Sequence, residues 1–126
     1  MNRLHLDTHV IVWLHAGAVE KLPPKARQLL ESEVLCCSPI VVLELQTLFE
    51  SGRVTQPAVE VISLLERRVG LVVTETKASA AVSEALGIPV SDVFDRLIAA
   101  EAALEKAQLL TKNEEIRKHY PRAVWD

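Results

Sequence analysis

The sequence predicts an α/β fold with a mostly parallel central sheet of four to five short strands and helices on both faces. Short, continuously apolar segments alternate with longer segments of helical periodicity, which is typical of βαβ units. The apolar segments lack polar–apolar alternation, as expected for strands that are covered on both sides. Because the 126 residues contain no linker, repeat or low-complexity tract, we expect a single domain over residues 1–126.

Turn and cap residues separate the predicted elements of the first half. The LPP segment at 22–24 interrupts helical periodicity, Ser38 and Pro39 are typical of a helix start, and Ser51-Gly52 ends that helix. In chain order, these signals predict the strand 4–6, the helices 10–15 and 25–33, the strand 34–37, the helices 40–50 and 57–68, and the strand 71–73.

The second half is divided in the same way. Gly87 and Pro89 end an alanine-rich helix, and Ser91-Asp92 caps the next one. The predicted elements are the helices 77–86 and 93–107, the strand 109–110, the helix 115–119 and the strand 123–125. Ligands of parallel α/β folds bind at the carboxyl ends of strands. Asp7 and the segment 111–113, which each follow a strand, are therefore the first candidates for a functional site.

Charge and hydropathy limit the classes of partner. The formal net charge is −3, which is unlike the basic balance of a general nucleic-acid binder. Any nucleic acid must then be held by a local basic patch or through a metal ion. Charged residues interrupt the apolar stretches well before the ~20 residues that a membrane span needs. The N-terminus has no signal-peptide pattern, so we expect a cytoplasmic protein without a membrane partner.

The two cysteines and the histidines predict no metal site. Cys36 and Cys37 are adjacent in a predicted strand and point to opposite faces, so they are expected to be buried and unable to bridge each other. Neither has a histidine nearby at the sequence spacing of a zinc site. His5 and His9 are expected to be packing or surface residues.

Four acidic residues are candidates for chemistry, and each also has a purely structural interpretation. Asp7 and Asp92 suit helix N-caps, and Asp92 with Asp95 resembles a capping box. Glu44 shares a helix face with apolar residues three and four positions away. A carboxylate on such a face is costly unless it is paired, bound to metal or able to reach water.

Convergence of Asp7, Glu44 and Asp95 on one pocket would require a cation. Two unit charges about 4 Å apart repel by roughly 4 kcal/mol at an effective dielectric constant of 20, so pKa values rise or a metal ion binds. Oxygen ligands select a hard cation, hence Mg²⁺ or Mn²⁺. Such an ion activates water and shields a phosphodiester, so we expect hydrolysis of a nucleic-acid backbone.

Segments along nearly the whole chain resemble the PIN-domain family, and within it the VapC-like toxins. These segments are LDTHVIVWL, SPIVVLEL, SDVFDRLIAAEA and LLTKNEEIRKHY. The resemblance implies a three-layer PIN-like fold and a Mg²⁺- or Mn²⁺-dependent endoribonuclease, the toxin of a type II toxin–antitoxin system. It also implies an RNA substrate, a cognate antitoxin that occludes the site, and a homodimer. The apolar helices 40–49 and 59–65 would supply these contacts or belong to the core.

The resemblance also assigns roles to particular residues. It places the metal-binding and catalytic acids on Asp7, Glu44 and Asp95, with Asp92 in a secondary position. Where the family usually has an aspartate after the strand ending in LLT, this chain has Asn113. Asparagine can still ligate through its carbonyl oxygen or hold a bound water, but it adds no charge.

Residues around these acids have supporting roles in this interpretation. Thr111 is expected to orient a ligand or a water near Asn113. Glu114 or Glu115 is a possible substitute for the missing acid. Arg96 and Lys112 are expected to contact the phosphates of the substrate. Because Arg96 directly follows Asp95, it is also expected to make the crevice less acidic than the chain as a whole.

Two other interpretations stay open. Phosphoryl transfer of the haloacid-dehalogenase kind needs a second aspartate two positions after Asp7, where this chain has His9. A PIN-like fold kept as an RNA- or protein-binding module would account for Asn113. Mg²⁺-dependent RNA cleavage that is lost in Asp7→Ala would separate the nuclease from such a module.

Overall fold

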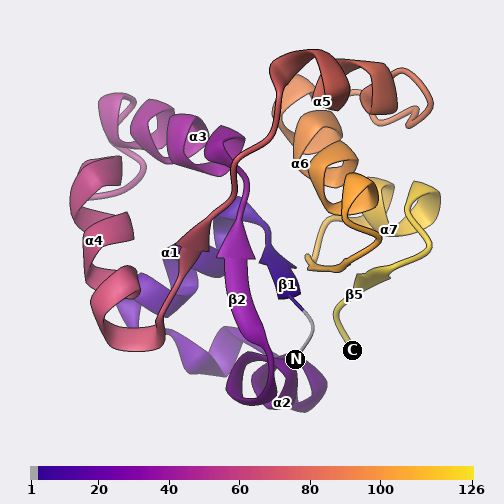
Figure 1. The fold of residues 1–126 in the computed structure, drawn as a ribbon. Coiled ribbons are helices and arrows are strands. Elements are labelled where there is room, and N and C mark those ends of the chain that lie inside the picture. Colours follow the sequence, from indigo (N-terminus) through magenta and orange to yellow (C-terminus); the bar gives the residue numbers. More distant parts are fainter. Residues whose placement is uncertain (1–2) are drawn as a thin grey trace.

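A five-stranded parallel sheet forms the centre of the protein. The computed structural model describes residues 3–126, and its strands lie in the order β3-β2-β1-β4-β5 with every pairing parallel (Figure 1). The strands are β1 (Arg3–Leu6), β2 (Val34–Cys37), β3 (Val72–Val73), β4 (Gln108–Leu110) and β5 (Ala123–Val124). The prediction of a parallel sheet of four to five short strands is confirmed.

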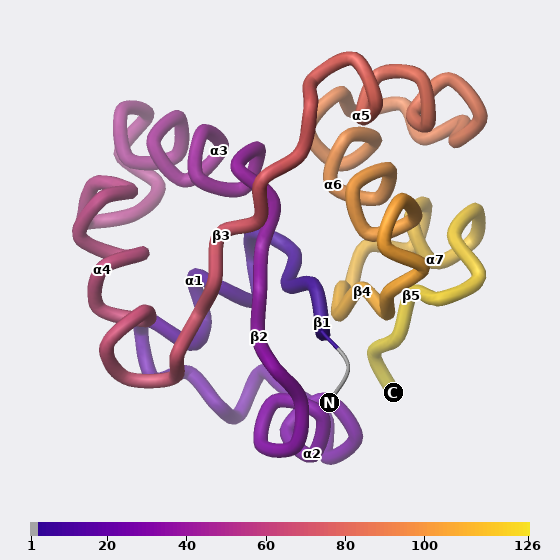
Figure 2. Tube along the Cα trace, in the orientation of Figure 1, coloured from indigo at the N-terminus to yellow at the C-terminus, as the bar shows by residue number. Residues whose placement is uncertain are grey.

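Helices cover both faces of this sheet, as predicted. They are α1 (Thr8–Ala16), α2 (Pro24–Ser32), α3 (Pro39–Glu50), α4 (Ala58–Val69), α5 (Ala78–Ala85), α6 (Val93–Leu104) and α7 (Glu114–His119). Figure 2 shows α3 and α4 on one side of β2, with α5 and α6 on the other. The helices α1, α3 and α4 contact one another, α5 and α7 pack on α6, and α3 also reaches α6.

The central strand β1 explains why the sheet needs helices on two sides. Its consecutive residues Leu4, His5 and Leu6 are each no more than 1% exposed. Neighbouring residues of a strand point to opposite faces, so both faces of β1 are buried. The core around it is mainly aliphatic, with fully buried side chains such as Ile11 and Leu45.

Several element boundaries differ from those predicted. A short 3₁₀ helix, η1 (Val19–Lys21), precedes the prolines at 23–24 and was not predicted. Helix α1 begins at Thr8 because Asp7 caps it. Helix α6 ends at Leu104 and not at residue 107, because Lys106 adopts the left-handed conformation with φ 54°.

The structure also shows the surroundings of the two cysteines and the character of the helices. Cys36 and Cys37 are both buried and free, as predicted. The parallel register of β1 and β2 pairs His5 with Cys36, a neighbour in space that sequence spacing does not reveal. Within residues 3–126, no helix combines the length and the apolar character needed to cross a membrane.

Candidate metal centre

Asp7 lies where the topology of the sheet opens a crevice. The chain runs from β1 outward to β2 and β3, and then returns to β4 on the other side of β1. Asp7 directly follows β1, and its backbone N–H donates to the Leu110 carbonyl at the end of β4 (3.1 Å). Parallel α/β sheets bind ligands at this kind of switch point, outside the carboxyl ends of the strands.

Two hydrogen bonds fix the Asp7 carboxylate. Its Oδ1 accepts from the Thr8 backbone N–H (2.8 Å), which caps α1, and its Oδ2 accepts from the Thr111 hydroxyl (2.5 Å). The residue is only 4% exposed, and this burial raises the pKa of Asp7 against the lowering effect of the two hydrogen bonds. Thr111 therefore orients the carboxylate of Asp7. The sequence had led us to expect that it orients a ligand or a water near Asn113.

Glu44 approaches from α3 and is linked to Asp7 through the residue between them. The Thr8 hydroxyl donates to Glu44 Oε1, while the Thr8 backbone holds Asp7. Burial raises the pKa of Glu44, and the nearby charge of Asp7 raises it further. Sequence reasoning did not single out Thr8. Its place in the first turn of α1, directly after an expected metal ligand, was the available signal.

Asp95 comes from the first turn of α6. The side chain of Asp92 caps this helix by accepting from the Asp95 backbone N–H (3.0 Å), which confirms the predicted cap. Burial is the main cause that raises the pKa of Asp95 to about 7, followed by the negative charges of Asp7, Asp92 and Glu44.

The three acids meet at one place. One carboxylate oxygen each from Asp7, Glu44 and Asp95 lie within 4.8 Å of one another. The pKa values of all three are raised, so the group carries its charge only at a cost when no cation is present. Three oxygen donors at this spacing suit a hard divalent cation. The three carboxylates therefore fit the Mg²⁺ or Mn²⁺ ion expected from the sequence.

Asn113 is placed differently from the sequence expectation. Its side-chain oxygen accepts from the Ile116 backbone N–H (3.0 Å) as the N-cap of α7, so the oxygen is engaged and not directed to a ligand. Its side-chain nitrogen donates to Asp95 Oδ2 (3.0 Å). Its backbone N–H donates to the Thr111 hydroxyl oxygen (3.0 Å). Asn113 is thus a neutral donor to one of the clustered acids.

The two basic residues expected near the site, Lys112 and Arg96, lie in different places. Lys112 lines the pocket that contains Asp7, Glu44, Asp92 and Asp95, called here the acidic pocket, as expected. Arg96 does not: its guanidinium donates to the carbonyls of Ala85 and Leu86 (2.7 and 3.4 Å) at the end of α5. Successive helical residues project about 100° apart, so Arg96 points away from the pocket that Asp95 faces. Arg96 therefore does not line the pocket that contains Asp95.

The possible substitutes for the missing acid are also elsewhere. Glu115 accepts from the backbone and the hydroxyl of Ser91 (2.6 and 2.9 Å), and these bonds lower its pKa. Glu114 is exposed and is not part of the pocket lining. Neither residue replaces the carboxylate that the family usually has at the position of Asn113.

Two aromatic rings complete the pocket. Its lining consists of Asp7, His9, Trp13, Glu44, Asp92, Asp95, Lys112 and Asn113. The rings of His9 and Trp13 lie 6.0 Å apart, and Trp13 in turn packs on Trp125 at 5.8 Å. Sequence reasoning assigned His9 to packing or surface and did not single out Trp13. Their spacing of four residues, on the helix that Asp7 caps, places both on one face.

Comparisons with known proteins agree with this architecture. The chain is similar to VapBC2 from Rickettsia felis bound to a DNA fragment from their promoter, with 19% identity and a TM-score of 0.71 over 98% of this chain and 99% of that chain. It is similar to VapBC-1 from nontypeable Haemophilus influenzae, with 22% identity and a TM-score of 0.59 over 98% of this chain and 96% of that chain. It is also similar to DNA-bound VapBC from Salmonella typhimurium, with 17% identity and a TM-score of 0.62 over 98% of this chain and 96% of that chain. These likenesses show the fold.

A search of the curated proteins found no match. The family model described as "PIN domain" matches residues 4–120, a range that contains every residue lining the acidic pocket. The chain therefore belongs to the PIN domain family.

Proposed function

We propose that this protein is a divalent-metal-dependent endoribonuclease and the toxin of a VapBC-type toxin–antitoxin pair. The observation that carries the proposal is the spacing of Asp7, Glu44 and Asp95, whose oxygens lie within 4.8 Å of one another at the switch point of the sheet. The PIN-domain match and the VapBC structures of similar fold support it.

Asp7, Glu44 and Asp95 would hold the ion, and their oxygen donors favour Mg²⁺ or Mn²⁺. When bound, such an ion lowers the pKa of water and stabilises charge on a phosphodiester. Thr8 and Thr111 hold two of the three carboxylates in place. Asp92 fixes the first turn of α6 and adds negative charge near Asp95. This support keeps the donors arranged before metal or substrate arrives.

The rest of the pocket supports an RNA substrate. Lys112 supplies a positive charge for phosphate at the edge of an otherwise acidic crevice. Single-stranded bases stack on aromatic side chains, and Trp13 with His9 offers such a surface beside the carboxylates. The proposed substrate is therefore a single-stranded or loop region of RNA, bound with a base near Trp13 and a phosphate near the ion.

The surface formed by α3 and α4 is consistent with binding of a protein partner. Between them lies a mainly apolar groove whose lining includes the exposed Leu43 (56%) and Val59 (69%). The inward residues of the same helices, such as Val41 and Leu65, belong to the core. The solved structures of similar fold are those of VapBC proteins. We propose a cognate antitoxin and a homodimer for this chain, acting in the cytoplasm.

RNA cleavage tests the proposal. The purified protein is incubated with fluorescently labelled RNA in millimolar Mg²⁺ or in a chelator, beside Asp7→Asn, Glu44→Gln and Asp95→Asn. We expect cleavage only with metal and only by the wild type, while circular dichroism shows that the variants fold. Metal-independent cleavage, or cleavage by all three variants, would contradict the proposal. Wild-type protein that binds RNA without cutting it would favour the binding-module interpretation.

A further inference from the structure

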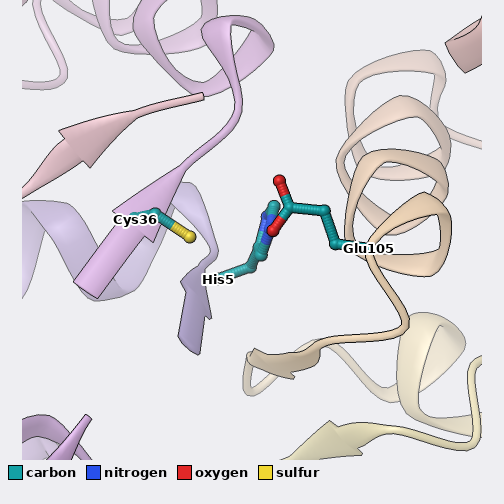
Figure 3. A group of neighbouring side chains, drawn as sticks. All are labelled: His5, Cys36 and Glu105. Atoms are coloured by element: carbon teal, nitrogen blue, oxygen red, sulfur yellow. The ribbon is translucent and has the colours of Figure 1, made fainter. Parts of the chain in front are cut away.

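A second cluster of possible metal ligands lies beneath α6. His5 of β1 and Cys36 of β2 are paired neighbours in the parallel register, so their side chains lie on the same face of the sheet. Glu105 directly follows α6 and reaches over this face. Figure 3 shows the ring, the sulfur and the carboxylate directed toward one another. None of these residues lines the acidic pocket.

The spacing of the three side chains suits a tetrahedral ion. One ligand atom from each of His5, Cys36 and Glu105 lie within 4.8 Å of one another, and His5 Nε2 is 3.1 Å from Glu105 Oε1. Zinc bonds of about 2.0–2.3 Å in a tetrahedron put ligand atoms about 3.3–3.7 Å apart. Small side-chain movements would therefore bring all three donors to bonding distance of one ion.

The polar atoms of this cluster are incompletely satisfied by the protein. His5 is only 1% exposed, and within residues 3–126 its Nδ1 has no hydrogen-bond partner. The thiol of Cys36 makes one long contact with the Leu4 carbonyl, at 3.6 Å. Buried polar groups without partners are costly, so the protein alone leaves the ring of His5 incompletely satisfied.

The surroundings of Glu105 already orient its carboxylate. Oε1 faces His5, while Oε2 accepts from the Arg3 guanidinium at 3.2 Å. A metal-binding carboxylate is commonly held in this way by a partner on its second oxygen. The Glu105 side chain is 30% exposed, so one of the three donors is in contact with solvent.

We propose that His5, Cys36 and Glu105 form a second metal site, which binds a transition-metal ion such as Zn²⁺ and is separate from the acidic pocket. One sulfur, one nitrogen and one oxygen select a borderline-soft ion over Mg²⁺. A water would supply the fourth ligand. The ion would tie the end of α6 to β1 and β2, and α6 carries Asp95 at its other end. The site is therefore structural and does not depend on the proposed nuclease function.

Coordination by Cys36 involves loss of its proton. Burial raises the pKa of the Cys36 thiol to about 12, so the free thiol is protonated at neutral pH. Binding forms a metal–sulfur bond and releases the thiol proton to the buffer, and no electron transfer is involved. The same burial protects the sulfur from other reactions when no ion is bound.

Co²⁺ titration of the full chain tests this proposal, because Co²⁺ replaces Zn²⁺ and its bond to thiolate absorbs strongly in the near ultraviolet. Excess Mg²⁺ is present to occupy the acidic pocket. We expect one equivalent of Co²⁺ to give the thiolate band, and Zn²⁺ to remove it. Absence of the band in folded wild-type protein would overturn the proposal without reference to any variant or to RNA cleavage.

Cys37 provides a matched control. It is the neighbouring buried free cysteine of β2 and points to the opposite face. We expect Cys37→Ala to keep the Co²⁺ band and the rise in melting temperature with Zn²⁺, and Cys36→Ala to lose both. A band that survives Cys36→Ala, or that disappears in folded Cys37→Ala, would contradict the assignment of the ligand.

Discussion

The side-chain nitrogen of Asn113 donates to Asp95 Oδ2 at 3.0 Å, which joins the start of α7 to the first turn of α6. This bond lowers the pKa of Asp95 against burial and the three neighbouring acids, although the pKa remains near 7. Asn113 thus supports the charged form of Asp95 without adding a negative charge. A carboxylate at the same position would add to the repulsion and attract a cation more strongly.

Asn113→Asp tests this relationship. Aspartate caps helices as well as asparagine does, so α7 should remain capped. Without metal at pH 8 we expect a lower melting temperature, because a fourth carboxylate would lie beside Asp95 in place of a donor. With Mg²⁺ we expect tighter binding than in the wild type, measured by calorimetry.

Glu114→Gln is the control for this substitution, since Glu114 is adjacent, exposed and outside the pocket lining. It should leave both the melting temperature and the Mg²⁺ affinity unchanged. Weaker Mg²⁺ binding by Asn113→Asp would contradict this, because it would mean that the Asn113 amide itself favours Mg²⁺ binding more than an added negative charge does.

The stability of the metal-free protein should fall as pH rises. Folding raises the pKa of Asp95 from 3.8 to about 7, so between these values the native state binds more protons than the unfolded state. The stabilisation is complete below pH 4 and is lost as pH rises through about 7. Asp7 and Glu44 shift in the same direction.

Thermal unfolding from pH 5 to 8 in a chelator measures this effect. We expect Asp95→Asn to flatten the pH profile and to raise the melting temperature at pH 8. Mg²⁺ should restore stability to the wild type at pH 8 and have little effect on the variant. A melting temperature that rises with pH in the metal-free wild type, as well as in Asp95→Asn, would show that folding does not raise the pKa of Asp95.

Thr111→Val should separate stability from metal binding. The change removes the hydroxyl that donates to Asp7 and accepts from the Asn113 backbone, so we expect a loss of about 1–3 kcal/mol in the free energy of unfolding. Affinity for Mn²⁺ should fall as well, because Asp7 loses a hydrogen bond that favours its charged form.

Thr74→Val is the matched control, because Thr74 is also buried and its hydroxyl donates to the Cys37 carbonyl (3.3 Å), away from the acids. It should lower stability and leave Mn²⁺ affinity unchanged. Equal loss of Mn²⁺ affinity in the two variants would show that general loosening of the fold, and not the orientation of Asp7, controls the site.

Substitutions of Lys112 and Arg96 should differ in their effect on RNA binding and on its salt dependence. Lys112→Met should weaken RNA binding and reduce its salt dependence by about one ion, as expected for a lost phosphate contact. Arg96→Met should lower stability, since it releases the end of α5, but should keep the salt dependence of the wild type. Filter binding over a range of salt concentrations compares them. A salt effect confined to Arg96→Met would reverse the assignment.

The fold was predictable because strand and helix patterns alternate clearly and because cap residues such as Ser38 and Asp92 begin helices where expected. Two details were not. Lys106 adopts a left-handed conformation that sequence patterns associate with glycine, so the end of α6 was placed too late. The turn η1 is too short to produce a periodic signal.

The candidate site was predictable to the extent that it depends on single elements. Asp7 follows a strand, and Glu44 interrupts an apolar helix face, so each is visible alone. The hydrogen bond from Thr8 to Glu44 joins two helices, and the contact of His5 with Cys36 depends on strand register. Such relations exist only after the elements pack. The direction of Arg96 likewise depends on where α5 ends.

The central claim is that Asp7, Glu44 and Asp95 share one divalent ion. Mn²⁺ binding followed by electron paramagnetic resonance measures this directly, because the signal of free Mn²⁺ falls as the ion binds. We predict binding by the wild type that Mg²⁺ displaces, and a loss of affinity of at least about tenfold in each of Asp7→Asn, Glu44→Gln and Asp95→Asn. Wild-type affinity in all three folded variants would contradict the account.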